Sequence, residues 1–381
     1  GVFVEFHVHA GDFIYAIGQH ADGGPIAGNP IYDLQPGQTL SEEFTYTITD
    51  PYGAISPPAI VTVTFEPSLV DLRVRTVEGY DTTTLWNDLH DGTITAISST
   101  QITVVNEGRT IEIDAKELTF DDLGNGDYSL TGGLIKGVHV SDSSGALFDA
   151  TRYSLPAETL DQAVGYFDST VFDSMLAEYG YDSHGGIGAD VLRGGNLTDY
   201  FDTGGGADIV VAGDGNDVIT ISDNAAWDID GGAGIDTIKL SGAFTLAAGP
   251  EGQNLTSIEI VDLNRTDANA VLVAPEDLYD INADHVARIL GNSSDTVMLT
   301  GQYPGYPEAQ WFLAQSGAGY TGDSATAGVS FDMYEYRVGE LALGTLYVEQ
   351  GVGVTVNNAP VILTNDLQTG GDDFGGTIVS Q

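Results

Sequence analysis

Residues 185–220 read as four consecutive segments of nine residues, and this repeat constrains the fold more than any other feature. The segments are GGIGADVLR, GGNLTDYFD, TGGGADIVV and AGDGNDVIT, and a fifth, GGAGIDTIK, returns at 231–239 after ten residues that match poorly. The sixth position of each segment holds an aspartate: Asp190, Asp199, Asp208, Asp217 and Asp236. The eighth position is always apolar: Leu192, Phe201, Val210, Ile219 and Ile238. So strict a spacing predicts a stack of equivalent structural units.

Each segment combines a glycine-rich turn with a short strand. Glycine adopts positive φ at little cost, so the first six residues can bend sharply. The last three residues form a strand whose middle side chain points inward, which explains the apolar eighth position. The glycines that we expect to shape these turns are Gly186, Gly188, Gly195, Gly204, Gly206, Gly213, Gly215, Gly232 and Gly234.

These segments match the pattern G-G-x-G-x-D-x-U-x and resemble the calcium-binding repeats of hemolysin-type, or RTX, proteins. The resemblance implies a parallel β-roll in which two segments complete one coil, so that every second turn stacks on its equivalent. It also implies Ca²⁺ between stacked turns, because backbone carbonyls and aspartate carboxylates are the oxygen ligands that this ion prefers. The five sixth-position aspartates, together with the backbone of the nine turn glycines named above, are therefore the expected metal-binding residues.

The stacking rule names three metal sites. Turn 185–190 should lie over turn 203–208, and turn 194–199 over turn 212–217. Turn 212–217 should also meet turn 231–236, so about three Ca²⁺ ions are expected. Two other readings of the glycines are a set of metal-free hairpin turns and a dinucleotide-binding loop. The second fails because no helix pattern follows the glycines and the negative net charge opposes phosphate.

Composition narrows the class of protein. The chain has 11 Lys and Arg against 56 Asp and Glu, a formal net charge of −45, which disfavours nucleic acids and anionic membranes as partners. Its 42% hydrophobic content is enough to build cores and argues against disorder. The absence of cysteine excludes disulfides and thiolate metal sites. No apolar run approaches the ~18 residues of a membrane span.

The flanking sequence predicts an all-β fold, with the calcium-binding parallel β-roll between β-sandwich modules and one or two short helices before the roll. Residues 31–66 resemble part of a VCBS or cadherin-like repeat, on alternating segments such as EEFTYTITD and AIVTVTF. The expected units are a partial sandwich (1–66), a β-rich module (67–155), a helical cap (156–180), the roll (181–242), a β-rich continuation and cap (243–358), and the start of a further repeat or an exchanged strand (359–381).

The resemblance implies a bacterial protein exported by type I secretion to the extracellular space or the cell surface. We expect a calcium-stabilised structural or adhesive protein that assembles with copies of itself, head to tail, into a filament or an S-layer. No G-x-S-x-G or H-E-x-x-H motif is present, so we expect no enzyme. The alternative is a module of an RTX polysaccharide lyase or hydrolase whose catalytic site lies elsewhere or within 67–152. Surface glycans are a third class of partner, for which 301–312 (GQYPGYPEAQWF) offers dense aromatic residues.

One further motif lies near the N-terminus. Glu5, His7 and His9 alternate along a predicted strand and so share one face. That face would suit a transition metal, but no third histidine is nearby except His20. A half-exposed strand face explains the same pattern, and we favour it.

Overall fold

The computed structural model describes the chain from residue 69 to residue 358, apart from residues 77, 166–168, 224, 226, 242–244, 248–253, 264–267, 302–305 and 307. It also describes Pro57 and the backbone of four strands nearer the N-terminus. These strands form two antiparallel hairpins, β1 (Val4–His9) with β2 (Asp12–Ile17) and β3 (Leu40–Tyr46) with β4 (Ala59–Phe65). The expected sandwich of 1–66 extends beyond these strands, and segment 359–381 lies wholly outside the described residues.

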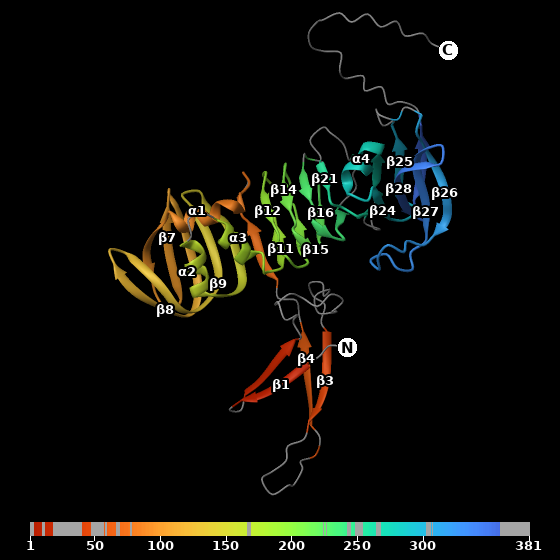
Figure 1. Ribbon diagram of the computed structural model, residues 1–381. Helices are drawn as coiled ribbons and strands as arrows, with labels where there is room; N and C mark the ends of the chain where they lie inside the picture. Colours follow the sequence, from red (N-terminus) through yellow and green to blue (C-terminus); the bar gives the residue numbers. More distant parts are fainter. Residues whose placement is uncertain are drawn as a thin grey trace, which may run out of the picture.

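The described chain is mostly β-structure with a few short helices, and its sheets are parallel and mixed. Figure 1 shows it as an elongated row, with antiparallel strands and helices at one end and stacked coils along the rest. Within the described residues, none of the helices has both the length and the apolar character required to cross a membrane.

The N-terminal part of this row is a curved antiparallel sheet. Its strands follow the order β5-β10-β9-β8-β7-β6. Their bounds are β5 (Val70–Val74), β6 (Thr93–Ile97), β7 (Gln101–Asn106), β8 (Arg109–Gly124), β9 (Asp127–Asp142) and β10 (Gly145–Pro156). The sequence predicts short strands here, yet β8 and β9 have 16 residues each. They are joined by Asn125 and Gly126, both at positive φ, the turn that best fits the twist of a hairpin.

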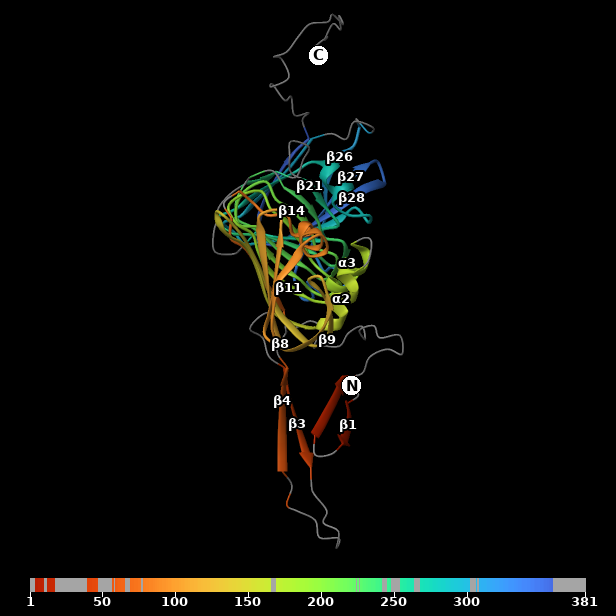
Figure 2. The ribbon, with the colours of Figure 1, turned by 90° about the vertical axis from the view of Figure 1, so that its left-hand side faces the viewer.

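Three short helices cover one face of this sheet (Figure 2). They are α1 (Leu85–His90), preceded by the 3-10 turn η1 (Thr82–Thr84), then α2 (Ala157–Val164) and α3 (Thr170–Leu176). The sequence predicts α2 and α3 as helices that pack on the first coil. Instead, α2 packs mainly against β9, where it buries Leu160. The end of α3 and the chain just after it do reach the first coil: the Tyr181 hydroxyl donates to the Leu176 carbonyl at 2.8 Å, and the Asn196 backbone N–H donates to the Ala177 carbonyl.

The remainder of the chain winds as stacked coils of parallel strands, which we call the solenoid (residues 181–357). The chain alternates between two sides of each coil. One side continues the N-terminal sheet, through β11 (Tyr181–His184), β13 (Tyr200–Asp202), β16 (Val218–Ile221), β19 (Thr237–Leu240), β22 (Ile260–Asp262), β24 (Val286–Leu290) and β28 (Leu341–Glu349). The N-terminal strands are therefore an extension of the same sheet, because β11 pairs parallel to β5.

The other side of the coil consists of two four-stranded parallel sheets. The first contains β12 (Val191–Arg193), β14 (Ile209–Val211), β17 (Asp228–Asp230) and β21 (Asn254–Thr256). The second contains β20 (Thr245–Ala247), β23 (Ala270–Val273), β25 (Thr296–Thr300) and β29 (Gly353–Asn357). Coiling thus continues well past residue 242, the boundary that the repeats alone predict.

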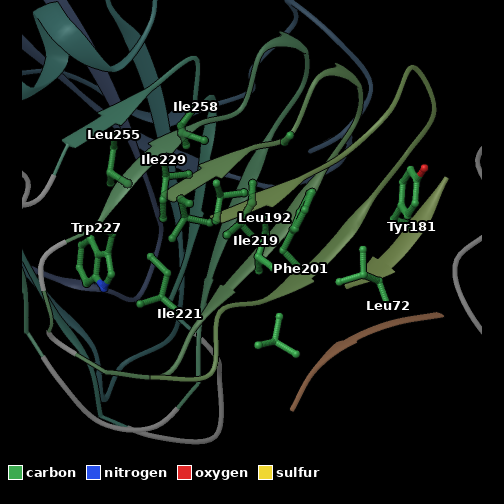
Figure 3. Packing of buried hydrophobic residues seen from close by; sticks show 14 of the residues in the cluster. Leu72, Tyr181, Leu192, Phe201, Ile219, Ile221, Trp227, Ile229, Leu255 and Ile258 are labelled. Carbon is green, nitrogen blue, oxygen red and sulfur yellow. The ribbon is translucent and has the colours of Figure 1, made fainter. Parts of the chain in front are cut away.

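Apolar side chains fill the interior of the coils. The five eighth-position residues are at most 2% exposed, so the inward direction predicted for them is confirmed. Figure 3 shows Leu192, Phe201 and Ile219 stacked inside the coil beside Ile229 and Leu255. Each rung repeats the same contact, which makes this core continuous along the solenoid.

The C-terminal end of the solenoid changes to antiparallel pairing. A helix, α4 (Pro275–Ile281), begins with proline, whose missing N–H is tolerated in a first turn. The last two strands of the large sheet are β27 (Phe331–Val338), which pairs with β28, and β26 (Gln310–Ala318), which pairs with β27. The sheet of fifteen strands therefore ends at β26 on one side and at β6 on the other.

Candidate metal centre

The glycine-rich turns stack in two columns. In the first column, turn 185–190 lies on turn 203–208, where the Gly205 N–H donates to the Gly186 carbonyl at 3.0 Å. In the second column, turn 194–199 lies on turn 212–217, which lies on turn 231–236. The three pairings predicted from the repeat are confirmed by these contacts.

A ladder of hydrogen bonds joins the sixth-position aspartates of each column. The Asp190 N–H donates to Oδ1 of Asp208 at 2.9 Å. In the second column, the Asp199 N–H donates to Oδ1 of Asp217 at 2.7 Å, and the Asp217 N–H donates to Oδ1 of Asp236 at 2.8 Å. All five carboxylates are at most 1% exposed. Successive turns therefore bring negative side chains together in the interior.

The second carboxylate oxygen divides these aspartates into two groups. Oδ2 of Asp190 accepts from the Gly186 N–H at 2.6 Å, and Oδ2 of Asp199 accepts from the Gly195 N–H at 2.7 Å. Oδ2 of Asp208, Asp217 and Asp236 is buried without any hydrogen-bond partner. A buried carboxylate oxygen without a partner is costly, so the three atoms favour a bound cation, a proton or another donor at these positions.

The electrostatics of these carboxyls agree with that preference. Burial raises the pKa of Asp199 and of Asp208 from 3.8 to about 7. Burial, followed by the charge of Asp199, raises the pKa of Asp217 to about 8. Burial likewise raises the pKa of Asp236 to about 8, and it raises that of Asp190 to a lesser extent. Without a metal, burial in the folded turns therefore favours the protonated form of these carboxyls more than water does.

The turn glycines make room for main-chain oxygens. Gly213 has a φ of +107°, and a β-carbon there would overlap the Gly195 carbonyl oxygen of the turn above. The six predicted glycines from Gly204 onward all have positive φ: Gly204, Gly206, Gly213, Gly215, Gly232 and Gly234. In the two uppermost turns, Gly186 and Gly195 do not. The carbonyl oxygens of Gly188, Leu197 and Gly215 also face the glycine of the next turn.

The donor set fits a hard cation such as Ca²⁺. Each interface between stacked turns presents two aspartate side chains and several main-chain carbonyl oxygens, and all of these are oxygen ligands. Among the described residues, no group of three or more His, Asp or Glu side chains converges as a metal site would. The proposed site at each interface has only two carboxylates, and main-chain carbonyl oxygens supply the remaining ligands, so it does not contain three acidic side chains.

The structure extends the columns at both ends with groups that the repeat does not reveal. At the N-terminal end, the Tyr80 N–H donates to Oδ1 of Asp190 at 2.7 Å, and the Tyr181 N–H donates to Oδ1 of Asp199 at 2.6 Å. At the other end of the second column, Oε2 of Glu259 accepts from the Asp236 N–H at 2.8 Å. In the first column, the next sixth position is the buried Trp227, so the acidic series stops there.

A related turn recurs further along the solenoid. Asp295 is fully buried, and its carboxylate accepts from the N–H groups of Asn269 at 2.9 Å and Asn292 at 2.7 Å. Gly291 precedes Asp295 by the same number of residues as Gly186 precedes Asp190. This glycine–aspartate spacing is the sequence feature that could have indicated the turn. Both oxygens of Asp295 are satisfied by backbone donors, as in the uppermost turns.

A second cluster of charged groups lies on the N-terminal sheet. His139 lies between Asp149, at 2.7 Å from Nδ1, and Asp114, at 3.2 Å from Nε2. Burial lowers the pKa of His139, but the two carboxylates outweigh it and leave the pKa above its ordinary value. Arg75 also pairs with Asp149, at 2.8 Å. The side chains of Glu5, His7 and His9 lie outside the described residues.

Comparison of the chain with family models, with curated proteins and with solved structures found no match. The functional argument therefore depends on the geometry of the turns.

Proposed function

We propose that residues 185–236 form a calcium-binding β-roll of the RTX type and hold about three Ca²⁺ ions between stacked turns. The ions would lie between turns 185–190 and 203–208, between 194–199 and 212–217, and between 212–217 and 231–236. When bound, Ca²⁺ would supply the positive charge that the buried carboxylates lack.

One observation carries this proposal. Three buried carboxylate oxygens have no partner, on Asp208, Asp217 and Asp236. One of them belongs to each of the three interfaces that the repeat identifies. In the uppermost turn of each column, where no turn lies above, backbone N–H groups satisfy both oxygens of the aspartate. The distribution of unsatisfied atoms therefore follows the expected distribution of ions.

Calcium would act as a structural element. Stacked carboxylates repel one another without a counter-ion, and the wider chain adds to this repulsion through its net charge of −45. The chain's own residues supply the rigid part, because the parallel ladder and the continuous core hold the turns in register. An elongated, acidic and metal-stiffened solenoid suits an extracellular spacer or adhesive protein of a bacterial surface.

The test is a calcium titration of the purified chain. We expect residues 185–236 to lose strand structure in EGTA and to regain it at sub-millimolar to millimolar Ca²⁺, the range of extracellular calcium modules. Circular dichroism and protease resistance would follow folding, and calorimetry would count the ions. Identical spectra and identical digestion with and without calcium, at neutral pH, would exclude the proposal.

A pair of substitutions tests the assignment of ligands. Asp208→Ala removes an unsatisfied oxygen, whereas Asp190→Ala removes a carboxylate that backbone donors already satisfy. We expect the first to raise the calcium concentration needed for folding more than the second. Equal effects would contradict the assignment of one ion to each unpaired oxygen.

We further propose that the protein is secreted and assembles with copies of itself, as the resemblance to RTX surface proteins implies. The head-to-tail contact expected from the sequence uses the N-terminal strands and segment 359–381, and that segment lies outside the described residues. Deleting 359–381 should abolish assembly in calcium if this contact exists, and light scattering would report the loss.

The alternative of an RTX enzyme calls for Tyr, His and Arg side chains clustered within 67–152. In the described part of that range, Tyr80 is buried near Asp88 and Arg109, whereas Arg75 and His139 share Asp149. The enzyme proposal would require the Tyr and His groups to act together, and these two clusters share no residue. Assays of polysaccharide cleavage by the calcium-loaded chain would distinguish the two proposals.

A further inference from the structure

The tip of the β8–β9 hairpin holds the only Asn-Gly pair of the chain, Asn125–Gly126. The two residues form a tight turn, because Gly124 pairs with Asp127 across it. Both have positive φ, 59° at Asn125 and 87° at Gly126, as in the type I′ turn that Asn-Gly favours. The same pair is also chemically reactive, because glycine has no side chain that would shield its backbone nitrogen.

Asn125 is open to water. Residues 121–127 are all exposed, and the first partly buried side chains below the tip, Phe120 and Tyr128, pack edge to face at 5.7 Å. In the part of the chain that the structure describes, no hydrogen bond involves the Asn125 side chain. A β-carbon built at Gly126 would meet nothing within 4 Å. Solvent therefore reaches both the Asn125 amide and the Gly126 nitrogen.

The turn can change its conformation at little cost. Cyclisation of an asparagine requires the next backbone nitrogen to approach the side-chain carbon Cγ, so the turn must leave its resting geometry briefly. Gly124 and Gly126 flank Asn125 and rotate more freely than other residues. The tip also buries no large apolar side chain, since Leu123 is 65% exposed. Segments with few buried apolar contacts open with a low free energy.

We propose that Asn125 is a site of spontaneous deamidation in the folded protein. The Gly126 nitrogen forms a bond to Cγ of Asn125 and gives up its proton, the Cγ–Nδ2 bond breaks, and Nδ2 leaves as ammonia. The product is a five-membered succinimide. Water then opens this ring at one of its two carbonyls, which yields either aspartate or isoaspartate at position 125. The balance is one water consumed and one ammonia released.

Each product alters the hairpin. Both add a negative charge to a tip that already carries Asp122 and Asp127. Isoaspartate also adds one atom to the main chain, because the chain then runs through the former side chain. The length of a two-residue turn fixes the register of its strands, so we expect the pairs Asp122–Tyr128 and Phe120–Leu130 to loosen.

This reaction is separate from calcium binding. The hairpin belongs to the N-terminal sheet, whereas the proposed ions lie between turns of residues 185–236. Deamidation uses only the chain and water, so it proceeds whether or not the coil binds calcium. A failure of this inference is therefore distinguishable from a failure of the proposed function.

The experiment is incubation of the whole chain in calcium at mildly alkaline pH, with peptide mass spectrometry of each asparagine over time. Asn254 serves as an internal reference, because it is also exposed, but its side chain donates to Asp228 at 2.9 Å and a leucine follows it. We expect Asn125 to lose its amide at least about tenfold faster than Asn254, a barrier lower by about 1.4 kcal/mol. Isoaspartyl methyltransferase with labelled S-adenosylmethionine would measure the isoaspartate formed.

A variant and a change of salt sharpen the assignment. Asn125→Gln keeps the amide but would need a larger ring, so it should remove most of the isoaspartate signal. Added salt should speed the reaction at Asn125, because hydroxide removes the Gly126 proton and salt screens the repulsion of hydroxide by the carboxylates at 121, 122 and 127. Near-UV circular dichroism confirms that the variant is folded.

Three results would overturn the proposal. One is an Asn125 that keeps its amide in the folded chain while the urea-unfolded chain loses it, since the fold would then protect the turn. Another is an equal rate at Asn125 and Asn254. The third is an isoaspartate signal that Asn125→Gln does not reduce, which would place the reaction at another residue.

Discussion

Asp217 offers a substitution whose effect should change sign with calcium. It is the middle aspartate of the second column, and it belongs to two of the three proposed ion sites. Asp217→Asn keeps an oxygen that can accept from the Asp199 N–H, and it replaces the unpaired Oδ2 with a neutral donor.

The magnitude follows from the pKa of the carboxyl. The folded state raises the pKa of Asp217 from 3.8 to about 8, so the folded protein binds this proton more tightly than the unfolded protein. A carboxyl of this kind favours folding below its ordinary pKa, and the contribution disappears as pH rises from about 4 to about 8. At about 1.4 kcal/mol per pKa unit, ionisation at pH 8 costs the metal-free fold on the order of 5 kcal/mol. Asparagine avoids this cost.

The assay is circular dichroism at pH 8, without urea in EGTA and along a urea series in excess calcium. Because the wild-type coil is expected to lose strand structure in EGTA, we expect Asp217→Asn to retain more strand structure than wild type there. In calcium we expect the variant to be less stable, because two sites lose a charged ligand. Asp127→Asn removes one charge from an exposed position on β9 and should shift the urea curve in calcium by no more than about 0.5 kcal/mol. A variant that is less stable than wild type under both conditions would refute the reasoning.

Three further outcomes are expected. Gly79→Ala should destabilise the first turn more than Gly108→Ala does, and hydrogen exchange of residues 186–193 would measure the difference. Both glycines have positive φ, but a β-carbon at Gly79 would overlap the Ala189 carbonyl, whereas Gly108 faces open space. Ile219→Ala should cost about 2–5 kcal/mol in calcium, measured by urea unfolding, because it empties a fully buried position of the coil. His139→Gln should lower the free energy of unfolding below pH 6.5, because Asp114 and Asp149 stabilise the imidazole only while it is protonated. The loss of unfolding free energy should become smaller as pH rises through the raised pKa of the folded imidazole.

The nine-residue repeat was enough to predict the local structure of each turn and strand of the coil. Glycines that can adopt positive φ, an aspartate at the sixth position and an apolar residue at the eighth all act within one turn and its strand. The inward direction of Phe201 and Ile219 therefore followed from the spacing alone, whereas the stacking of every second turn was implied by the resemblance to RTX repeats. The identity of the metal is a different matter, because it depends on a resemblance and stays a prediction.

The length of the solenoid could not be obtained in the same way. Beyond residue 242 the coil is built without the glycine repeat. Glu259 joins the second column, and Asp295 lies in a related turn further on, through the parallel pairing of the strands that follow them. The sequence around Glu259 contains no glycine turn that would have indicated this. Parallel pairing joins strands that are about a coil apart, so local patterns carry little information about it.

What the sequence determined by itself is the chemistry of each turn: where the chain bends, which side chain enters the core, and which carboxylate is buried. What only the tertiary structure decided is which of those carboxylates lack a partner. Asp190 and Asp208 occupy the same position of the repeat, yet the Tyr80 and Gly186 N–H groups satisfy the first, and the second retains an unpaired oxygen. Burial and hydrogen bonding depend on what stacks above and below each turn, and for Asp190 that neighbour comes from a segment over a hundred residues earlier in the chain.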